Sequence, residues 1–466
     1  MNKTVRFNEA LDSARTILRA CASDIPGAHV FIVRDFFGRL HLGLEGSSEQ
    51  HSQAIEPLLE LWHPQLGAYA PTPSSQVFWR DEMFDPDAIF ASPDAQYLGD
   101  IGEGKSLFLI ERQTMAKDWL RNSKQTDSNA DDFLPLGIPS VTFYGFKGGV
   151  GRSTALAAFA WWAASTLDKK VLVIDLDLES PGISTNFVRP YTIRHAPKGL
   201  FSIEDHALPD FGVIDWLIED AVGQADAALL IDMVAPAPPS NRGEIRVVPA
   251  FGEKTGRYIP KLGRVYADVR STRGVEHFGE RLQRMCTDLI KKESPDIVLL
   301  DSRAGLHDIA SVAITHLSSV ALLFATSGAQ SWMGYRELLA NWKSQPAHAQ
   351  KIREKLKVVA ALIPQTLEER SRFTDKLTDA SWECFSAIYD QIEAAPALSP
   401  EDQALDVFNF DRDDEDAPHW PLKVFWSPAY VDANFILQPE LLSENHFNPA
   451  FGDFVEGLGE LVGMGR

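Results

Sequence analysis

The segment from Val141 to Thr154, VTFYGFKGGVGRST, carries the clearest chemistry in the sequence. Apolar residues typical of a buried strand lead into a glycine-rich loop, and a helix-forming run, ALAAFAWWAAS, follows at once. Glycines let backbone N–H groups converge on a phosphate without obstruction by Cβ atoms, and the N-terminus of the helix adds about half a positive charge. Strand, loop and helix come in the order that phosphate binding needs. We therefore predict a phosphate-binding loop rather than a plain turn.

Three side chains of this segment could act on a bound phosphate. Lys147 and Arg152 carry positive charge near the two ends of the loop, and Ser153 directly follows the second of them. A hydroxyl in that position can bind magnesium, so Ser153 is the expected metal ligand. The residues predicted to contact the bound group are Gly145, Lys147, Gly148, Gly149, Val150, Gly151, Arg152, Ser153 and Thr154.

The loop resembles the deviant Walker A motif of the ParA/MinD superfamily of P-loop ATPases. Relatives carry an extra lysine near the start of the loop, and in the family this lysine reaches the partner's phosphates across a dimer interface. Lys147 matches it here. The later basic residue is usually lysine in the family but is Arg152 here, as in a subgroup with a KGGVGR motif. The resemblance implies ATP and Mg²⁺ as ligands and an ATP-dependent homodimer. Because the planar fork of arginine is not equivalent to an ammonium group, we expect nucleotide binding with slow hydrolysis.

Three aspartates continue the resemblance. In LVIDLDLESPG, Asp175 and Asp177 match the family's D-x-D, and Asp177 aligns with the carboxylate that orients the attacking water. In DIVLLDSRAG, Asp301 ends an apolar strand, where a carboxylate can hold magnesium through water. As alternatives, Asp177 is an ordinary strand-terminal acid and Asp175 supports the loop through hydrogen bonds. The resemblance thus implies Lys147, Arg152 and Asp177 as catalytic residues and Ser153, Asp175 and Asp301 as metal ligands.

Later segments match the family more loosely. VAALIPQT ends where relatives often place a polar residue that reads the base, and VFWSPAY takes the position of the adenine-side strand and loop. The resemblance therefore implies Gln365, Pro428 and Tyr430 as nucleotide contacts. Arg303 stands where relatives carry a Pro- or Gly-rich switch. It is expected either to reach a phosphate or the partner subunit, or to form a structural salt bridge.

The chain divides into two predicted domains. Residues 1–120 indicate a small α+β domain, with apolar residues at helical spacing near the start and a hairpin pattern around Asp35. Residues 121–137 are polar and without periodicity, as in a linker. From residue 138 to 466, apolar runs alternate with helical patterns, which predicts an α/β domain with a mainly parallel sheet flanked by helices. The resemblance makes this domain a P-loop NTPase fold and does not cover the first one.

A formal net charge of -21 disfavours binding to DNA or to anionic lipid. One stretch runs against this acidic balance, with two acidic residues, Glu253 and Asp268, among six basic ones. We interpret it as a solvated loop, with a local binding patch as the alternative. The basic residues of the stretch are Lys254, Arg257, Lys261, Arg264, Arg270 and Arg273.

The three cysteines, Cys21, Cys286 and Cys384, are far apart and show no metal-binding spacing, so we expect buried free thiols. The sequence contains no signal-peptide pattern and no run of about 18 apolar residues. We therefore expect a cytoplasmic protein without a membrane segment.

Two functions of different classes fit these observations. The first is an ATP-driven dimerisation switch with slow or partner-dependent turnover, acting with a protein effector or regulator. The second is a non-hydrolysing nucleotide sensor or scaffold, in which the N-terminal domain binds an effector. The resemblance to the KGGVGR subgroup implies a bacterial regulatory, partitioning or phage-defence setting, with DNA segregation as the role that the acidic charge disfavours.

Overall fold

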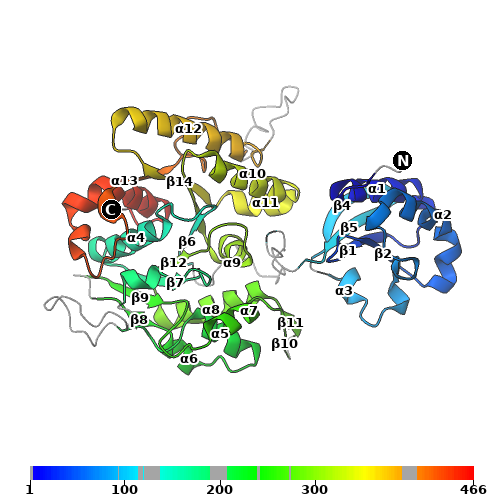
Figure 1. The fold of residues 1–466 in the computed structure, drawn as a ribbon, viewed down its shortest axis with the longest axis horizontal. Helices are drawn as coiled ribbons and strands as arrows, with labels where there is room; N and C mark the ends of the chain where they lie inside the picture. Colours follow the sequence, from blue (N-terminus) through cyan, green and yellow to red (C-terminus); the bar gives the residue numbers. More distant parts are fainter. Residues whose placement is uncertain are drawn as a thin grey trace, which may run out of the picture. The chain divides into compact units, whose positions relative to one another are not determined.

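The computed structural model forms two compact units, residues 1–126 and 127–466 (Figure 1). The predicted linker falls almost wholly outside the described residues, as does Arg273. The structure describes residues 4–92, 94–113, 119, 137–188, 207–238, 242–271, 274–390 and 407–465.

The smaller unit is built on a mixed five-stranded sheet with the order β3-β2-β1-β5-β4. The predicted hairpin is confirmed, because β1 and β2 pair antiparallel around a turn in which the Asp35 carboxylate accepts from the backbone N–H groups of Phe37 and Arg39. The strands are β1 (His29–Arg34), β2 (Leu40–Leu44), β3 (Val77–Trp79), β4 (Gln96–Gly102) and β5 (Lys105–Glu111). The helices are α1 (Phe7–Ala20), α2 (Ser48–Leu66) and α3 (Asp87–Phe90).

The core of this unit lies between its sheet and the pair α1 and α2. Ile17 and Leu18 of α1 meet Leu58 and Trp62 of α2 in one buried cluster with the inward residues of β1, β2 and β5. The Trp62 indole N–H donates to the carbonyl of Leu40 at 3.0 Å, so this large side chain is buried without an unsatisfied donor. The other face of the sheet is covered by a smaller cluster, to which the short α3 contributes Ile89.

The larger unit is built on an eight-stranded sheet with the order β15-β14-β13-β6-β12-β7-β9-β8. All of its strands are parallel except β8, which pairs antiparallel with β9 at the edge. The predicted apolar runs all form strands, so the expected parallel α/β domain is confirmed. The strands are β6 (Ser140–Gly145), β7 (Lys170–Asp175), β8 (Ala235–Pro236), β9 (Glu244–Val248), β12 (Ile297–Asp301), β13 (Val320–Ala325), β14 (Leu356–Ile363) and β15 (Leu422–Phe425).

Helices cover both faces of this sheet. Alternate residues of a strand point to opposite faces, so Val171 and Val173 pack toward α4 and α13 while Leu172 and Ile174 pack toward α5, α8 and α9. The helices are α4 (Arg152–Thr166), α5 (Val213–Ala221), α6 (Ala227–Asp232), α7 (Tyr258–Val265), α8 (Phe278–Glu293), α9 (Asp308–Val312), α10 (Ala329–Lys343), α11 (Pro346–Arg353), α12 (Leu367–Phe385) and α13 (Glu444–Leu461). A separate strand pair is formed by β10 (Val269–Ser271) and β11 (Gly274–Glu276).

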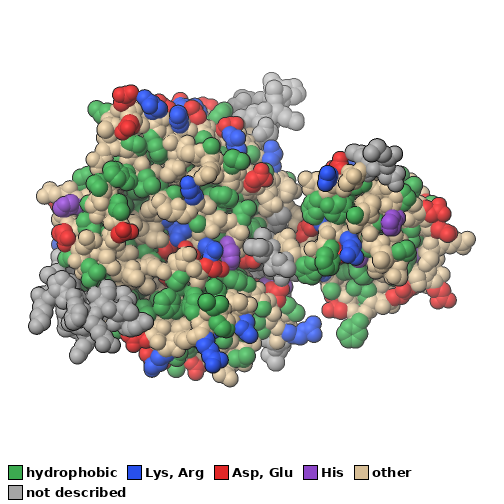
Figure 2. All heavy atoms as spheres, in the orientation of Figure 1, with side chains coloured by type: hydrophobic (Ala, Val, Ile, Leu, Met, Phe, Trp, Pro, Cys, Tyr) green, Lys and Arg blue, Asp and Glu red, His purple; other side chains and the backbone are tan. Residues whose placement is uncertain are grey.

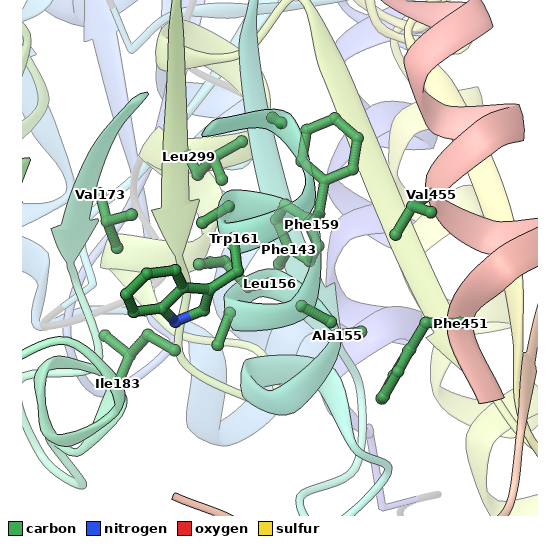
Figure 3. Close-up of a cluster of buried hydrophobic side chains, with 14 of the residues drawn as sticks. Phe143, Ala155, Leu156, Phe159, Trp161, Val173, Ile183, Leu299, Phe451 and Val455 are labelled. Atoms are coloured by element: carbon green, nitrogen blue, oxygen red, sulfur yellow. The ribbon is translucent and has the colours of Figure 1, made fainter. Parts of the chain in front are cut away.

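Helix α4 is held between the sheet and α13 (Figure 3). Phe143 and Leu299 of the sheet face it from one side, and Phe451 and Val455 of α13 face it from the other. Its run of small and apolar residues suits burial on nearly all sides, and Phe159 is wholly inaccessible to solvent. Burial of such a side chain contributes roughly 1.5–3 kcal/mol. The site at the N-terminus of α4 therefore rests on a rigid support.

Three further expectations can be compared with the structure. The three cysteines are free and buried, as predicted. No described helix combines the length and the apolar character needed to span a bilayer. The interpretation of the basic stretch as a solvated loop is wrong in part, because residues 258–265 form α7 and two short strands follow it. The sequence signal was weak there because Pro260 and Gly263 interrupt the helical pattern.

Candidate phosphate-binding site

The glycine-rich loop connects the end of β6 to the start of α4, as the sequence predicts. Gly149 and Gly151 both have φ of +75°, a left-handed conformation that side chains rarely adopt. A Cβ atom added to Gly148 or Gly149 would meet no atom within 4 Å, so these two glycines border open space. The loop therefore leaves its backbone uncovered in front of the N-terminus of α4, where N–H groups attract anions.

Residues far along the chain fix the start of this loop. The hydroxyl of Tyr335 on α10 accepts from the backbone N–H of Phe146 at 3.2 Å and donates to the carbonyl of Phe324 at 2.9 Å. The Phe146 ring packs on Gly334, where an added Cβ would lie 2.1 Å from the ring. Neither Tyr335 nor Gly334 carries a local sequence signal, because their role depends on tertiary contact.

The loop borders a cavity of about 400 Å³. All the predicted loop contacts from Lys147 onward line it, whereas Gly145 lies below it and packs against the loop's own backbone. Ser180 and Ala304 line it without having been predicted. The complete lining is Lys147, Gly148, Gly149, Val150, Gly151, Arg152, Ser153, Thr154, Asp177, Ser180, Arg303 and Ala304.

Arg152 lies at the floor of this cavity and bridges two carboxylates. Its Nε donates to Oδ1 of Asp301 at 2.9 Å, and its terminal nitrogen donates to Oδ2 of Asp177 at 3.1 Å. Ser153 donates its hydroxyl proton to the second oxygen of Asp301 at 2.8 Å. Because β6, β7 and β12 are neighbours in a parallel sheet, their carboxyl ends bring these side chains together. The structure thus assembles four of the predicted residues in one network.

Burial and charge shape the proton affinities of this network. Burial raises the pKa of Asp301, although Arg152 and Ser153 oppose that effect. Burial alone would lower the pKa of Arg152, but Asp301 and Asp177 outweigh it and raise this pKa above its ordinary value. The guanidinium group is therefore a permanent cation that neutralises the carboxylates around it.

Asp175 lies at the end of β7, fully buried beneath this network. Its two carboxylate oxygens accept from the backbone N–H groups of Asp177 at 3.1 Å and Gly182 at 3.2 Å. Burial and the nearby charge of Asp301 raise the pKa of Asp175 well above its usual range. These contacts support the loop-holding role for Asp175, and its contact with magnesium stays a prediction.

The donor set suits magnesium only together with phosphate. Among the described residues, no group of three or more His, Cys, Asp or Glu side chains is placed to hold a metal ion alone. Mg²⁺ prefers hard oxygen ligands and is commonly bound by one or two carboxylates together with phosphate oxygens and water. The Ser153 hydroxyl and the Asp301 carboxylate, 2.8 Å apart, are oxygen donors of this kind. They would hold the ion, directly or through water, once phosphate is bound.

A second cavity of about 320 Å³ continues from the first. Gly149, Gly151 and Thr154 line both cavities, so a single elongated ligand can occupy them together. Leu362 borders the second cavity with φ of +60°, at a register shift of β14 against β15. The complete lining is Gly149, Gly151, Thr154, Leu362, Val424, Phe425, Trp426, Ser427, Tyr430, Val431, Asp432 and Phe451.

The three nucleotide contacts predicted from the later segments, Gln365, Pro428 and Tyr430, fall at different places around this second cavity. Tyr430 lines it, and its hydroxyl donates to the carbonyl of Leu441 at 2.7 Å. Gln365 donates its amide to the carbonyl of Trp426 at 3.1 Å, which places it beside the lining. Pro428 begins a short 3₁₀ turn and is not among the lining residues. Trp426, which is 44% exposed, was not predicted although its indole is the larger stacking surface.

Lys147 and Arg303 both have partners within the chain. The exposed Lys147 ammonium donates to the side-chain carbonyl of Gln330 at 3.0 Å. Arg303 forms the salt bridge that was one of its two alternatives, with 2.6 Å between its guanidinium and the Glu179 carboxylate. It also lines the phosphate cavity, so the two alternatives are compatible.

Comparisons with known proteins give matches among solved structures. No model of a known protein family matches the chain, and no curated protein matches it. A ParA family ATPase from Chlorobium tepidum is 17% identical and covers 67% of this chain and 92% of its own, with a TM-score of 0.38. The MinD cell division protein of Aquifex aeolicus is 16% identical and covers 69% and 96%, with a TM-score of 0.38. A Cyanothece McdA variant bound to ATP is 15% identical and covers 71% and 98%, with a TM-score of 0.37.

These similarities are low both in sequence identity and in TM-score. They do not extend to the KGGVGR subgroup or to the role of any residue.

Proposed function

We propose that this protein binds ATP with Mg²⁺ and hydrolyses it slowly, and that the bound nucleotide brings two copies together. The observation that carries the proposal is the pair of joined cavities, one bordered by the uncovered glycine loop and the other by an aromatic strand end. A triphosphate fits the first because helix N-terminus, Lys147 and Arg152 all supply positive charge. A base fits the second, where Trp426 and Tyr430 offer aromatic surface.

Each group of the site has a stated part in this function. Arg152 and Lys147 neutralise phosphate charge, and Ser153 and Asp301 hold the magnesium ion. Asp177, whose carboxylate lines the cavity, orients the attacking water. Phosphoryl transfer of this kind needs positioning and charge stabilisation rather than covalent chemistry.

Slow turnover follows from the position of Arg152. Its guanidinium donates hydrogen bonds to Asp177 and Asp301. These are the two carboxylates that we assign to the attacking water and to the magnesium ion. Phosphate and magnesium must therefore replace these bonds before the site is complete. Binding energy consumed in this exchange cannot lower the barrier of the chemical step.

Isothermal titration calorimetry with ATP and Mg²⁺ tests nucleotide binding. Lys147→Ala and Ser153→Ala should each weaken binding, because one loses a phosphate contact and the other a metal ligand. Lys343→Ala and Ser165→Ala are matched controls at exposed positions that line neither of the two joined cavities. Unchanged affinity and turnover in both site variants would overturn the proposal.

Light scattering tests the switch. An Asp177→Ala variant, which should bind ATP without hydrolysing it, is expected to double in mass with ATP and to remain a monomer with ADP. Binding linked to one association state shifts the population toward it. Equal mass in all nucleotide states would exclude the switch.

A second function is favoured by the same arginine. A guanidinium held between two carboxylates suits a nucleotide sensor that binds ATP without hydrolysing it. In this function the smaller unit is the module that binds an effector. Arg152→Lys distinguishes the two. A variant at least as fast as the wild type with unchanged affinity identifies arginine as the limit on turnover, whereas absence of hydrolysis in both proteins under every partner condition favours the sensor.

A further inference from the structure

Helix α7 and the strand pair β10–β11 carry a surface whose charge is opposite to that of the whole chain. Arg257, Arg264 and Arg270 are exposed and form no ion pair with any residue that the structure describes. Figure 2 shows blue side chains over the part of the larger unit where Figure 1 places α7 and β10–β11. We call the surface formed by residues 257–271 and 274–276 the α7 surface.

The same elements carry exposed apolar side chains. Ile259 is 80% exposed at the start of α7, and Val275 is 42% exposed on β11. Other basic residues nearby are already paired, since Lys254 contacts Asp210 and Lys261 contacts Asp215. Arg264 donates to the carbonyl of Pro260 but, like the other two arginines, has no carboxylate partner among the described residues. Three such cations, on elements that also expose apolar residues, complement an acidic segment with apolar side chains. The phosphate backbone of a nucleic acid would match the charge but would offer no apolar side chain to Ile259 and Val275, so a protein segment is the favoured occupant.

Both ends of α7 are attached to the loop that follows β7. The Tyr258 hydroxyl donates to the carbonyl of Leu178, and the Tyr266 hydroxyl donates to Glu179 at 2.6 Å. The same loop carries Asp177, which lines the phosphate cavity. The α7 surface is thus hydrogen-bonded to the loop that carries Asp177 of the candidate site.

Glu179 joins this attachment to the phosphate cavity. Besides Tyr266, it contacts the His307 ring at 3.1 Å and the Arg303 guanidinium at 2.6 Å. Arg303 lines the cavity, so a bound phosphate would compete with Glu179 for its charge. If the phosphate draws Arg303 away, Glu179 keeps only its contacts with Tyr266 and His307. A change in the cavity therefore alters the anchor of α7.

We propose that the α7 surface docks an acidic segment of a partner protein, and that phosphate in the neighbouring cavity changes the strength of docking by competing with Glu179 for Arg303. The coupling half of this inference rests on the proposed nucleotide binding. The docking half does not.

Fluorescence anisotropy with a labelled peptide of glutamate and leucine residues tests the docking half. The combined variant Arg257→Glu, Arg264→Glu and Arg270→Glu should bind the peptide at least tenfold more weakly than the wild type. The matched control carries the same change of charge on α10, α11 and α12, through Lys343→Glu, Lys351→Glu and Arg372→Glu, and should bind nearly as the wild type does. Thermal melting of both variants checks that they are folded.

Three results would overturn the docking half. In the first, the wild type fails to bind the peptide. In the second, the control variant loses as much peptide affinity as the α7 variant, which would show an effect of net charge alone. In the third, labelled duplex DNA binds to the wild type more tightly than the peptide does and the α7 variant loses this DNA binding, which would assign the surface to nucleic acid.

The coupling half is tested by repeating the titration with a non-hydrolysable ATP analogue and Mg²⁺. The peptide affinity of the wild type should change by about fivefold or more, a common size for coupling between two sites. Glu179→Gln should lose this change, because an amide cannot compete for the charge of Arg303. If calorimetry shows that the analogue binds while the peptide affinity stays constant, the coupling is excluded. If the analogue does not bind, the proposed function fails and the docking result still stands.

Discussion

Both units consist of a sheet with helices packed on it, but the two sheets place the polar residues at their strand ends differently. The sheet of the smaller unit is mixed, with β1 antiparallel to β2 but parallel to β5, so the carboxyl ends of its strands are divided between two opposite edges. The sheet of the larger unit is parallel from β15 to β9, and β6, β7 and β12 all end at one edge. There the loop residues Arg152 and Ser153 meet Asp177 and Asp301. Parallel order gathers polar groups at one edge, whereas mixed order disperses them.

We therefore expect the stability of the smaller unit to be independent of nucleotide binding by the larger unit. Trp62→Ala removes a fully buried indole from its core and should lower its free energy of unfolding by about 3–5 kcal/mol, with the affinity of the larger unit for nucleotide unchanged. Urea unfolding and calorimetry on the same samples measure both quantities. Leu61→Ala, at a 40% exposed position of the same helix, is the control. A parallel loss of nucleotide affinity would show that the two units are not independent.

The larger unit should respond to pH through a buried lysine. Lys355 donates to the carbonyls of Thr315 and Ser318, and burial lowers its pKa from 10.5 to about 7. Between these values the unfolded chain binds the proton and the folded chain does not, so this lysine makes the unfolding free energy rise with pH across that window.

Removal of this lysine should flatten the pH dependence. We expect Lys355→Met to reduce the rise in unfolding free energy from pH 7 to 10 by an amount on the order of a few kcal/mol at most. Lys343→Met, at an exposed position, should keep the wild-type slope. Chemical denaturation at a series of pH values provides the measurement, and an unchanged slope in Lys355→Met would contradict the assignment.

The carboxylates of the site should bind a metal once their arginine is removed. Arg152→Met leaves Asp301 and Asp177 without their cation, so Mn²⁺ should bind at least tenfold more tightly in the absence of nucleotide, a gain of about 1.4 kcal/mol. Electron paramagnetic resonance of free Mn²⁺ measures this. Arg303→Met, on the same cavity but paired with Glu179, is the control. Equal Mn²⁺ affinity in the wild type and in Arg152→Met would show that Arg152 does not weaken metal binding at this site.

The smallest expected effect is at a helix end of the larger unit. The Asp226 carboxylate caps α6 by accepting from the backbone N–H of Leu229 at 2.9 Å, so Asp226→Ala should cost about 1 kcal/mol. Asp232→Ala, at the opposite end of this helix, removes a charge that the helix dipole disfavours and should cost nothing. Thermal unfolding of the two variants compares them directly.

The sequence allowed the phosphate loop and the parallel sheet to be predicted because both depend on local pattern. The loop follows a buried strand and precedes a helix, and Asp301 ends an apolar run, so their meeting follows from parallel topology. The conformation of α2 was less accessible, because Pro57 and Pro64 lie inside that helix and obscure its signal.

The rest depends on contacts between distant residues. Tyr335 reaches the loop from α10, Trp426 reaches the second cavity from β15, and Glu179 collects Tyr266, His307 and Arg303 from separate elements. No spacing rule relates these positions, since their distances along the chain are set by intervening helices. The ion pairs of Arg152 were likewise beyond prediction, because several acceptors were open to it.

The burial of α4 has a consequence for how the chain can vary. Alanines occupy positions 155, 157, 158, 160, 163 and 164 of this helix, and each is wholly inaccessible to solvent. A longer side chain at any of them would have to displace the sheet or α13, and overpacking of this kind usually costs about 1–3 kcal/mol. The helix therefore has almost no side on which neutral substitutions can accumulate. Substitutions should therefore accumulate most slowly in α4, although only the first turn of this helix lines the phosphate cavity.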